Sequence, residues 1–215
     1  MAITDYATLK TAVADYLHRS DLSDSVMSNF VQLGEARLNR KLRLLEQEAV
    51  GTLSLTSGAD NVALPSDWIE TIDVIYATDK QSIQPQNLKS LNSQRTYDGT
   101  TARPRLYATT NGTMQFEITA DATYSILINY FQRWDIATDD TNWLLTNAPD
   151  AYLYSALLEA KAYVKSAEDM SIWSMGLKTA IDDLNNLDNR SRRNSTVRME
   201  AGLVRGGRFD INRGY

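Results

Sequence analysis

Apolar residues near the start of the chain recur every three or four positions, which is the spacing of one face of a helix. Between Asp5 and Leu17 these positions are Tyr6, Leu9, Val13 and Tyr16. Thr4 or Asp5 can cap this first helix. A second helix is predicted to begin with Asp24 or Ser25 as its cap, and its apolar side consists of Met27, Phe30, Val31, Gly34, Leu38 and Leu42.

The pattern changes to short β-like runs between Leu45 and about Thr138. Turn signals separate runs such as VGTLSL, IETIDVIYA and TYSILINYFQRW. Asn111-Gly112 lies between two runs, and both residues tolerate the positive φ that a tight type I′ turn requires, so a hairpin is predicted there. Residues 86–97 are expected to form a loop with a short helix.

Helical spacing returns near Asn142. Pro149 suits the first turn of a helix that extends to about Val164, because proline lacks only an N–H that would be unpaired there. After a break near Ser166, a narrow apolar seam predicts a last helix that ends near Arg193. The seam consists of Met170, Trp173, Leu177, Ala180, Leu184 and Leu187.

These elements predict an α+β fold: a four-helix bundle with a β-rich insert between helices 2 and 3, followed by an extended C-terminal tail. Neither helix pair can cover its apolar stripe alone, so residues 1–44 and 141–194 are expected to form the two halves of one bundle. Residues 45–140 form the insert domain, and residues 195–215 form the tail.

Composition narrows the class of protein. The 215 residues include no cysteine, which excludes disulfides and thiolate metal sites. The N-terminus lacks the pattern of a secretion signal, and no run of about 18 apolar residues occurs, so neither export nor a membrane span is expected. The length suffices for one large domain or two small ones.

Catalytic and metal-binding chemistry finds little support in the sequence. The only histidine, His18, stands at a predicted helix end, where a capping or surface role is more common than general base catalysis. The acidic pairs Asp139-Asp140 and Asp182-Asp183 lack the spacing of an oxygen-ligand loop and are expected to be solvated. We therefore expect neither an enzyme nor a bound cofactor or metal.

Aromatic residues at helical spacing, such as Trp173, could form a stacking platform for bases. The helical spacing favours packing in the core or at a subunit interface instead. Trp173 is thus a candidate interface residue.

The C-terminal tail differs from the rest of the chain in charge. From Arg190 to Tyr215 there are seven arginines against two acids, a net charge of +5, so the preceding 189 residues carry −10 of the overall −5. Such a body repels nucleic acid, and only the tail could bind it. Ordering about 20 residues costs on the order of 20 to 40 kcal/mol, so the tail alone should be disordered.

Apolar residues alternate with the arginines of the tail, and an arm that binds by charge alone does not need them. Arginine forks, apolar side chains and glycines together are typical of a peptide that docks on a protein surface. The candidates for this contact are Arg198, Arg205, Arg208, Phe209, Arg213 and Tyr215.

Several stretches resemble one known family. FVQLGEARLNRKLR after YLHRSDL, the LPSDWIE turn, the hairpin RPRLYATTNGTMQFEITADATYSILINYFQRW and the helices of TNWLLTNAPDAYLYSALLEAKAYVKSAEDMSIW are similar to bacteriophage adaptor proteins. These are the head-to-tail connectors of the virion neck, and the likeness follows the family order over nearly the whole chain. Gly34 departs from the alanine usual in relatives, which is expected to loosen that helix.

The resemblance implies a structural protein that forms a homo-oligomeric ring, typically of twelve subunits, beneath the portal. The ring links the capsid to tail or nozzle proteins and surrounds the passing viral DNA without binding it specifically. The protein would be found in the virion neck, and in the host cytoplasm during assembly. C-terminal segments in the family grip the portal, which implies the same role for the arginine tail. Arg37 and Arg40 match the family's Glu-Ala-Arg-x-x-Arg pattern and are expected in salt bridges of the fold or subunit interface, or at a solvated helix end.

Two other functions stay open. A nucleic-acid-binding protein would use the arginine tail as its arm, and its DNA affinity would fall steeply with salt. A tail-associated hydrolase would have to recruit His18, and no catalytic constellation accompanies that residue.

Overall fold

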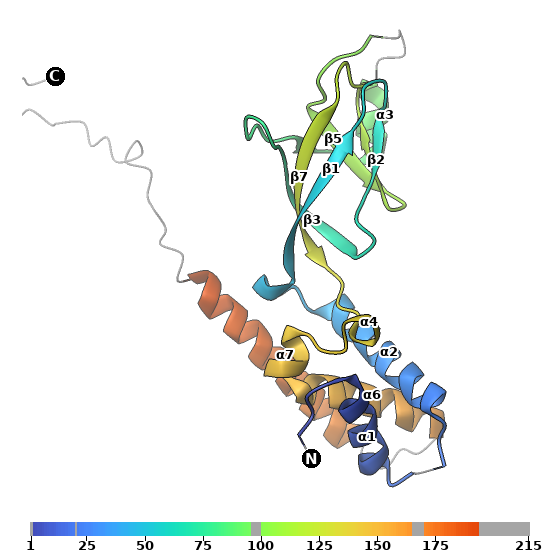
Figure 1. Cartoon of the computed structure of the whole chain (residues 1–215). Coiled ribbons are helices and arrows are strands. Elements are labelled where there is room, and N and C mark those ends of the chain that lie inside the picture. Colours follow the sequence, from blue (N-terminus) through green and yellow to red (C-terminus); the bar gives the residue numbers. More distant parts are fainter. Residues whose placement is uncertain (1, 20, 96–99, 165–169, 194–215) are drawn as a thin grey trace, which may run out of the picture.

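The computed structural model describes residues 2–19, 21–95, 100–164 and 170–193. Its described residues form a helical part and a β part joined end to end (Figure 1). The helical part contains α1 (Tyr6–Leu17), α2 (Asp24–Lys41), α4 (Ile136–Asp139), α5 (Trp143–Asn147), α6 (Pro149–Val164) and α7 (Met170–Arg193). The β part contains η1 (Leu45–Gln47), β1 (Glu48–Leu55), β2 (Asn61–Ala63), β3 (Trp68–Tyr76), β4 (Gln84–Pro85), α3 (Leu88–Gln94), β5 (Leu106–Thr110), β6 (Thr113–Phe116) and β7 (Tyr124–Gln132).

α6 is the central helix of the helical part, and α1, α2 and α7 each pack against it. Its sequence explains this position, because most of its residues are apolar or small and a helix of that kind is buried on several sides. One hydrophobic cluster joins residues of all four helices. The mixed α+β class is confirmed, and the regular four-helix bundle remains a prediction.

Gly34 allows α2 to approach α6 closely. A Cβ added at Gly34 would lie 2.7 Å from Ser155 Oγ and 2.9 Å from the backbone nitrogen of Ala156. Ordinary contacts between heavy atoms lie near 3.5–4.0 Å, so only glycine fits this crossing without displacement. The glycine therefore permits tight packing between the two helices, rather than the looser helix that we expected.

The β part is built from two sheets that share one hydrophobic cluster. The first sheet has the order β1-β7-β3, and the second has the order β2-β6-β5-β4. β7 lies at the centre of the first sheet and shows the period of a strand with one buried face, because Ile126, Ile128 and Tyr130 are buried and the residues between them are not. The inward side chains of the two sheets thus form a core separate from that of the helices.

The hairpin predicted at Asn111-Gly112 is confirmed. β5 and β6 pair antiparallel with Thr110 opposite Thr113, so the connecting loop has two residues. Asn111 has φ 47° and Gly112 has φ 71°, as a type I′ turn requires. The short helix expected within residues 86–97 is also present as α3.

Most helix boundaries follow the sequence prediction, with three differences. Asp5 caps α1 as expected, but α2 has Ser23 as its N-cap rather than Asp24 or Ser25. Tyr16 is 54% exposed although it continues the apolar stripe of α1, whereas the next residue, Leu17, packs against the helical cluster. The short helix α4 was not expected.

The chain returns to the helical part before the expected end of the insert at residue 140. Trp134 and Ile136 are buried in the helical cluster, just after β7 ends at Gln132. The division into domains remains a prediction. Polar contacts join the hydrophobic cluster of the helical part directly to that of the β part, so no separate linker marks the boundary among the described residues.

Candidate assembly interface

The six tail residues predicted to bind a partner all lie outside the described residues. Arg198, Arg205, Arg208, Phe209, Arg213 and Tyr215 therefore stay predictions. The structure does describe the helix from which the tail departs, and the contacts that hold the end of that helix.

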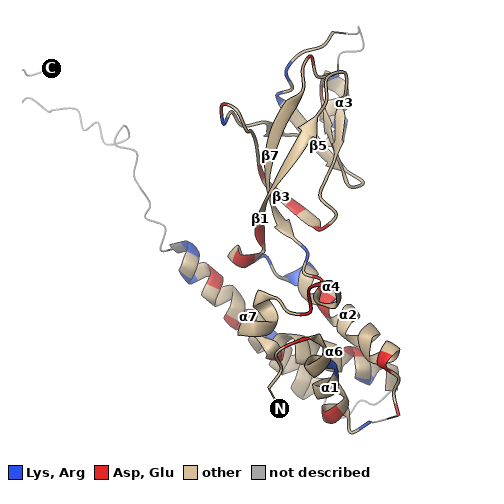
Figure 2. Cartoon of the chain, in the orientation of Figure 1, with Lys and Arg blue, Asp and Glu red and all other residues tan. Residues whose placement is uncertain are grey.

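The last turns of α7 are fixed to the beginning of the β part. Asp188 accepts a hydrogen bond from the backbone N–H of Leu45 at 2.7 Å, and Arg192 contacts both Asp188 at 2.6 Å and Glu48 at 2.9 Å. Figure 2 shows the basic end of α7 beside the acidic residues of η1 and β1. The C-terminal tail therefore starts from a defined point on the molecule.

The apolar seam of α7 is buried over its middle turns. Trp173, Leu177, Ala180 and Leu184 are buried, and Leu187 is 50% exposed. The ammonium of Lys161 lies 5.0 Å from the centroid of the Trp173 ring, a cation–π contact within the chain. Trp173 is thus part of the chain's own core, and its role at a subunit interface stays a prediction.

Another apolar pair on α7 faces outward. Ile172 is 65% exposed and Met175 is 72% exposed. Both stand in the N-terminal half of α7, on a different side from the buried seam. Large apolar side chains of this kind on one helix face are typical of a surface that packs against another polypeptide.

Arg37 forms an ion pair with Glu159 of α6. Both side chains are about one-third exposed or less, so this pair helps to hold α2 against α6 within one chain. Arg40 is exposed, and no ion pair is found for it among the described residues. Arg37 thus has the fold-internal salt bridge that was one of its two expected roles, and Arg40 fits the alternative of a solvated helix end.

A buried polar network connects α2 to the chain segment that leaves the β part. The side-chain amide of Asn39 donates to the carbonyl of Trp134 at 2.9 Å and accepts from its N–H at 3.2 Å. Glu35 Oε1 accepts from the N–H of Ile136 at 2.9 Å and from the hydroxyl of Tyr152 at 2.7 Å. These bonds satisfy backbone groups that would otherwise be buried and unpaired, and they fix where the helical part resumes.

Glu35 carries the most perturbed carboxyl group of this network. Burial raises the pKa of Glu35 to about 7, against the opposing effect of its hydrogen bonds from Tyr152 and Ile136. Burial also raises the pKa of the Tyr152 hydroxyl, so the phenol stays protonated and donates to Glu35. The network could not be predicted from the sequence, because Glu35 and Asn39 look like surface residues of an amphipathic helix.

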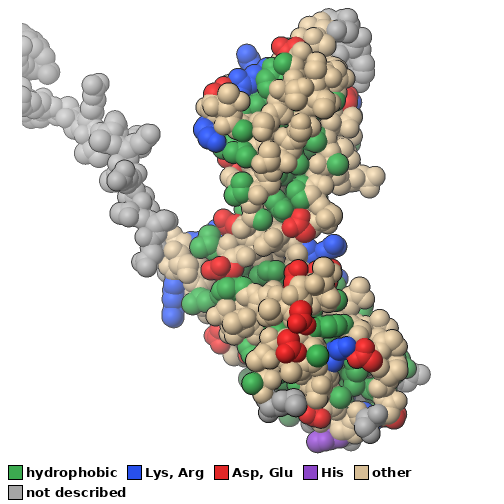
Figure 3. Space-filling view, in the orientation of Figure 1, with side chains coloured by type: hydrophobic (Ala, Val, Ile, Leu, Met, Phe, Trp, Pro, Cys, Tyr) green, Lys and Arg blue, Asp and Glu red, His purple; other side chains and the backbone are tan. Residues whose placement is uncertain are grey.

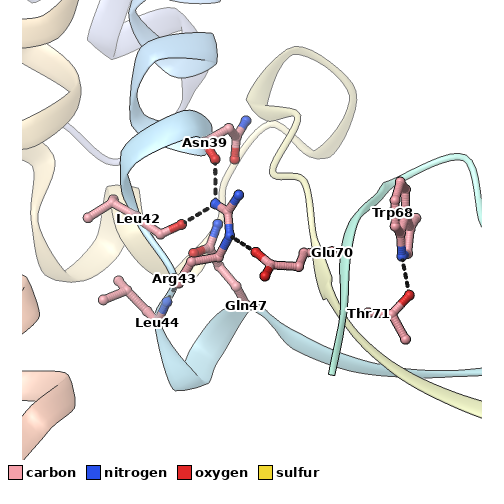
Figure 4. A network of polar contacts seen from close by, with 8 residues as sticks. All are labelled: Asn39, Leu42, Arg43, Leu44, Gln47, Trp68, Glu70 and Thr71. Atoms are coloured by element: carbon pink, nitrogen blue, oxygen red, sulfur yellow. Dashed lines mark hydrogen bonds and ion pairs between the residues drawn. The ribbon is translucent and has the colours of Figure 1, made fainter. Parts of the chain in front are cut away.

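Arg43 joins the end of α2 to the first sheet (Figure 4). Its Nη1 donates to the carbonyls of Asn39 and Leu42 at 2.8 and 2.6 Å, and its Nε donates to Glu70 of β3 at 3.0 Å. A guanidinium suits this position because it can satisfy helix carbonyls and a carboxylate together. Together with Asn39, Arg43 holds the helical part to the β part.

The described residues contain no group of three or more histidines, cysteines or acids placed to hold a metal ion. His18 is exposed and forms the C-cap of α1 with φ 52°, as the sequence analysis favoured. No helix within the described ranges is long and apolar enough for a membrane span.

The described geometry comprises a braced junction between the helical part and the β part, exposed apolar side chains on α7, and an end of α7 that is tied to η1 and β1. The sequence profile of the SU10 adaptor protein family matches residues 4–200, which is most of the chain. The chain therefore belongs to the SU10 adaptor protein family, which confirms the resemblance to bacteriophage adaptor proteins. No curated protein sequence matches the chain closely enough to indicate a relationship.

Proposed function

We propose that this phage adaptor is a structural protein of the virion neck, which assembles as a ring beneath the portal, connects the capsid to the tail or nozzle proteins and surrounds the DNA channel. The family match over residues 4–200 carries this proposal. The subunit number that we expect, twelve, comes from the family resemblance. An acidic body supports the role, because a channel lined with carboxylates lets DNA slide past.

The outer face of α7 is our candidate for contact between neighbouring subunits. Ile172 and Met175 are exposed in the single chain, and burial of two such side chains in each contact contributes on the order of 3 kcal/mol. Replacement of Met175 by Glu should reduce ring formation and leave the melting temperature of the monomer unchanged. Ser174→Glu is the matched control, because it adds the same single negative charge at an exposed position that lies on a different side of the same helix. Equal ring formation by the two variants would exclude this face.

The C-terminal tail is our candidate for the portal contact. Removal of residues 197–215 leaves all described residues in place and should abolish association with the portal protein. Negative-stain microscopy of the protein mixed with portal gives the direct readout: rings on portals for the full chain, and bare portals for the truncated chain. Rings of the truncated chain on portals would refute this role of the tail.

The same truncation distinguishes the proposed portal contact from the alternative that the tail binds nucleic acid. Under our proposal the full and truncated chains bind DNA equally weakly at every salt concentration. A DNA affinity that depends on the tail and falls steeply with salt would favour a nucleic-acid-binding arm instead.

A further inference from the structure

The C-terminal half of α7 forms one wall of a groove, which we call the α7 groove. Its floor is apolar and includes Leu45 of η1, Trp143 of α5, and Leu184 and Leu187 of α7. Leu45 is 42% exposed and Leu187 is 50% exposed, a large apolar area for a water-facing surface. Figure 3 shows hydrophobic side chains gathered near the end of α7 on this face.

Carboxylates line the rim of the α7 groove. They are Glu46 and Asp188 at one end, and Asp150 and Asp183 at the other. No lysine or arginine is among the described residues that line the groove. Asp150 and Asp183 form no ion pair within the part of the chain that the structure describes. Asp188 is paired with Arg192, so the unpaired negative charge lies at the end of the groove formed by Asp150 and Asp183. The groove thus combines an apolar floor with unpaired carboxylates, and its complement is a chain that is both apolar and basic.

Residues 197–215, the C-terminal arm, have this chemistry and follow the described end of α7 in sequence. Four arginines and two acids give the arm a net charge of +2. The described part of α7 ends at Arg193, and Ser191 already lines the groove. From Ser191 to Ala180 the groove follows α7 for about 16 Å, whereas 19 extended residues span about 60 Å, so the arm is long enough to turn back and follow it.

The sequence of the arm also fits the order of apolar and charged groups in the groove. If RFDINR binds as an extended chain, Phe209 and Ile211 would share one side, because side chains alternate with a period of two. Arg208 lies on the opposite side, where it can face the rim. Tethering adds to the affinity, because an attached peptide reaches an effective concentration in the millimolar range.

We propose that in the unassembled protein the α7 groove binds the C-terminal arm of the same chain, with Phe209 and Ile211 on the apolar floor and Arg208 facing Asp150 and Asp183. This contact is additional to portal binding and needs no partner protein. Its consequence is that the arm is covered until a surface that binds it more tightly takes it from the groove.

The cysteine-free sequence allows a direct test in the full-length chain. Asn212→Cys is combined with Asn147→Cys on the rim of the groove, and the rate of disulfide formation is measured in dilute protein without portal. The matched control combines Asn212→Cys with Asn189→Cys, which is nearer to the arm in sequence but does not line the groove. We expect the Asn147 pair to form an intramolecular disulfide about ten times faster than the control pair.

Two further variants test the chemistry. Replacing Asp150 and Asp183 by Asn, or Phe209 by Ala, should each slow the Asn147 disulfide, and the acid-to-amide variant should remove most of the dependence of the rate on salt. Equal rates for the Asn147 and Asn189 pairs would overturn the proposal. Disulfide-linked dimers in place of intramolecular bonds would also overturn it, since the occupant would then be a second copy. The proposed function in the virion neck is tested separately, by whether the chain without residues 197–215 still binds the portal.

Discussion

Gly34→Ala gives the most direct test of how the helical part is packed. In an exposed helix the replacement of glycine by alanine stabilises by roughly 0.5–1 kcal/mol, because alanine loses less backbone entropy on folding. At Gly34 the added Cβ would lie 2.7 Å from Ser155 Oγ and 2.9 Å from the nitrogen of Ala156. The second contact is with backbone, so no side-chain rotation relieves it.

The expected result is a net destabilisation. Forcing an extra carbon into a packed interior typically costs about 1–3 kcal/mol, and the gain in helix propensity offsets part of this. We therefore expect a loss of about 1–2 kcal/mol, which for a chain of this size lowers the melting temperature by roughly 2–8 °C. Thermal unfolding followed by circular dichroism measures the shift.

Two further variants serve as controls for Gly34→Ala. Combining it with Ser155→Ala removes the 2.7 Å contact but leaves the contact with the Ala156 nitrogen, so only partial recovery is expected. Gly176→Ala makes the same change within α7, where the three atoms nearest to the new Cβ belong to the ring of half-buried Tyr154, a side chain that can shift. If Gly34→Ala stabilises the protein as much as Gly176→Ala does, the close α2–α6 approach is refuted.

Three other predictions concern the polar contacts between elements. The pKa of Glu35 is raised from 4.5 to about 7, so the stability that its protonated form provides is complete below pH 4.5 and is lost as pH rises through 7. Glu35→Gln should therefore raise the melting temperature at about pH 8. The same variant should also reduce the decrease in melting temperature that the unchanged protein shows between about pH 5 and pH 8. A double-mutant cycle on Arg37 and Glu159, with alanine at each position, should give a coupling energy of about 1 kcal/mol in chemical denaturation, and a value near zero would show that the pair contributes no net stability. Arg43→Met should cost about 1–3 kcal/mol by freeing helix carbonyls and Glu70, and an unchanged denaturation midpoint would contradict the bracing role.

The elements that the sequence predicted well are those whose signals are local. The helix that begins at Pro149 has the expected start, and the last helix covers the expected seam from Met170, because long apolar periods and a proline at the first turn act within the segment. The break predicted near Ser166 lies outside the described residues. The turn at Asn111-Gly112 is set by two residues that accept positive φ. None of these predictions needs knowledge of a distant partner.

The contacts that the sequence could not predict depend on residues far apart in the chain. The partner of Asn39 is 95 positions away, and the hydroxyl that binds Glu35 is 117 positions away. A polar residue in an amphipathic helix resembles a solvated one until the packing brings a donor to it. The exposure of Tyr16 and Leu187 has the same origin, since periodicity identifies a helix face but not the length over which a neighbour covers it.

The sequence indicated which residue types of the C-terminal tail could bind a partner, but it did not indicate the surface on which they would bind. The charge and alternation of the tail are visible in the sequence, and its residues lie outside the described part of the chain. The α7 groove could not have been anticipated, because η1, which is far from α5, α6 and α7 in sequence, completes its lining.

The attachment of α7 to the first strand determines how the molecule responds to mechanical load. A pull on the C-terminal arm reaches Arg192 and Asp188, and through them Glu48 at the base of β1 and the N–H of Leu45. Tension is thus shared between the helix and the β1–β7 ladder, whose eight residue pairs begin at Glu48. Under force, these ties must break before the helix can unwind from its end, so a pull on the arm loads the helical part and the β part together.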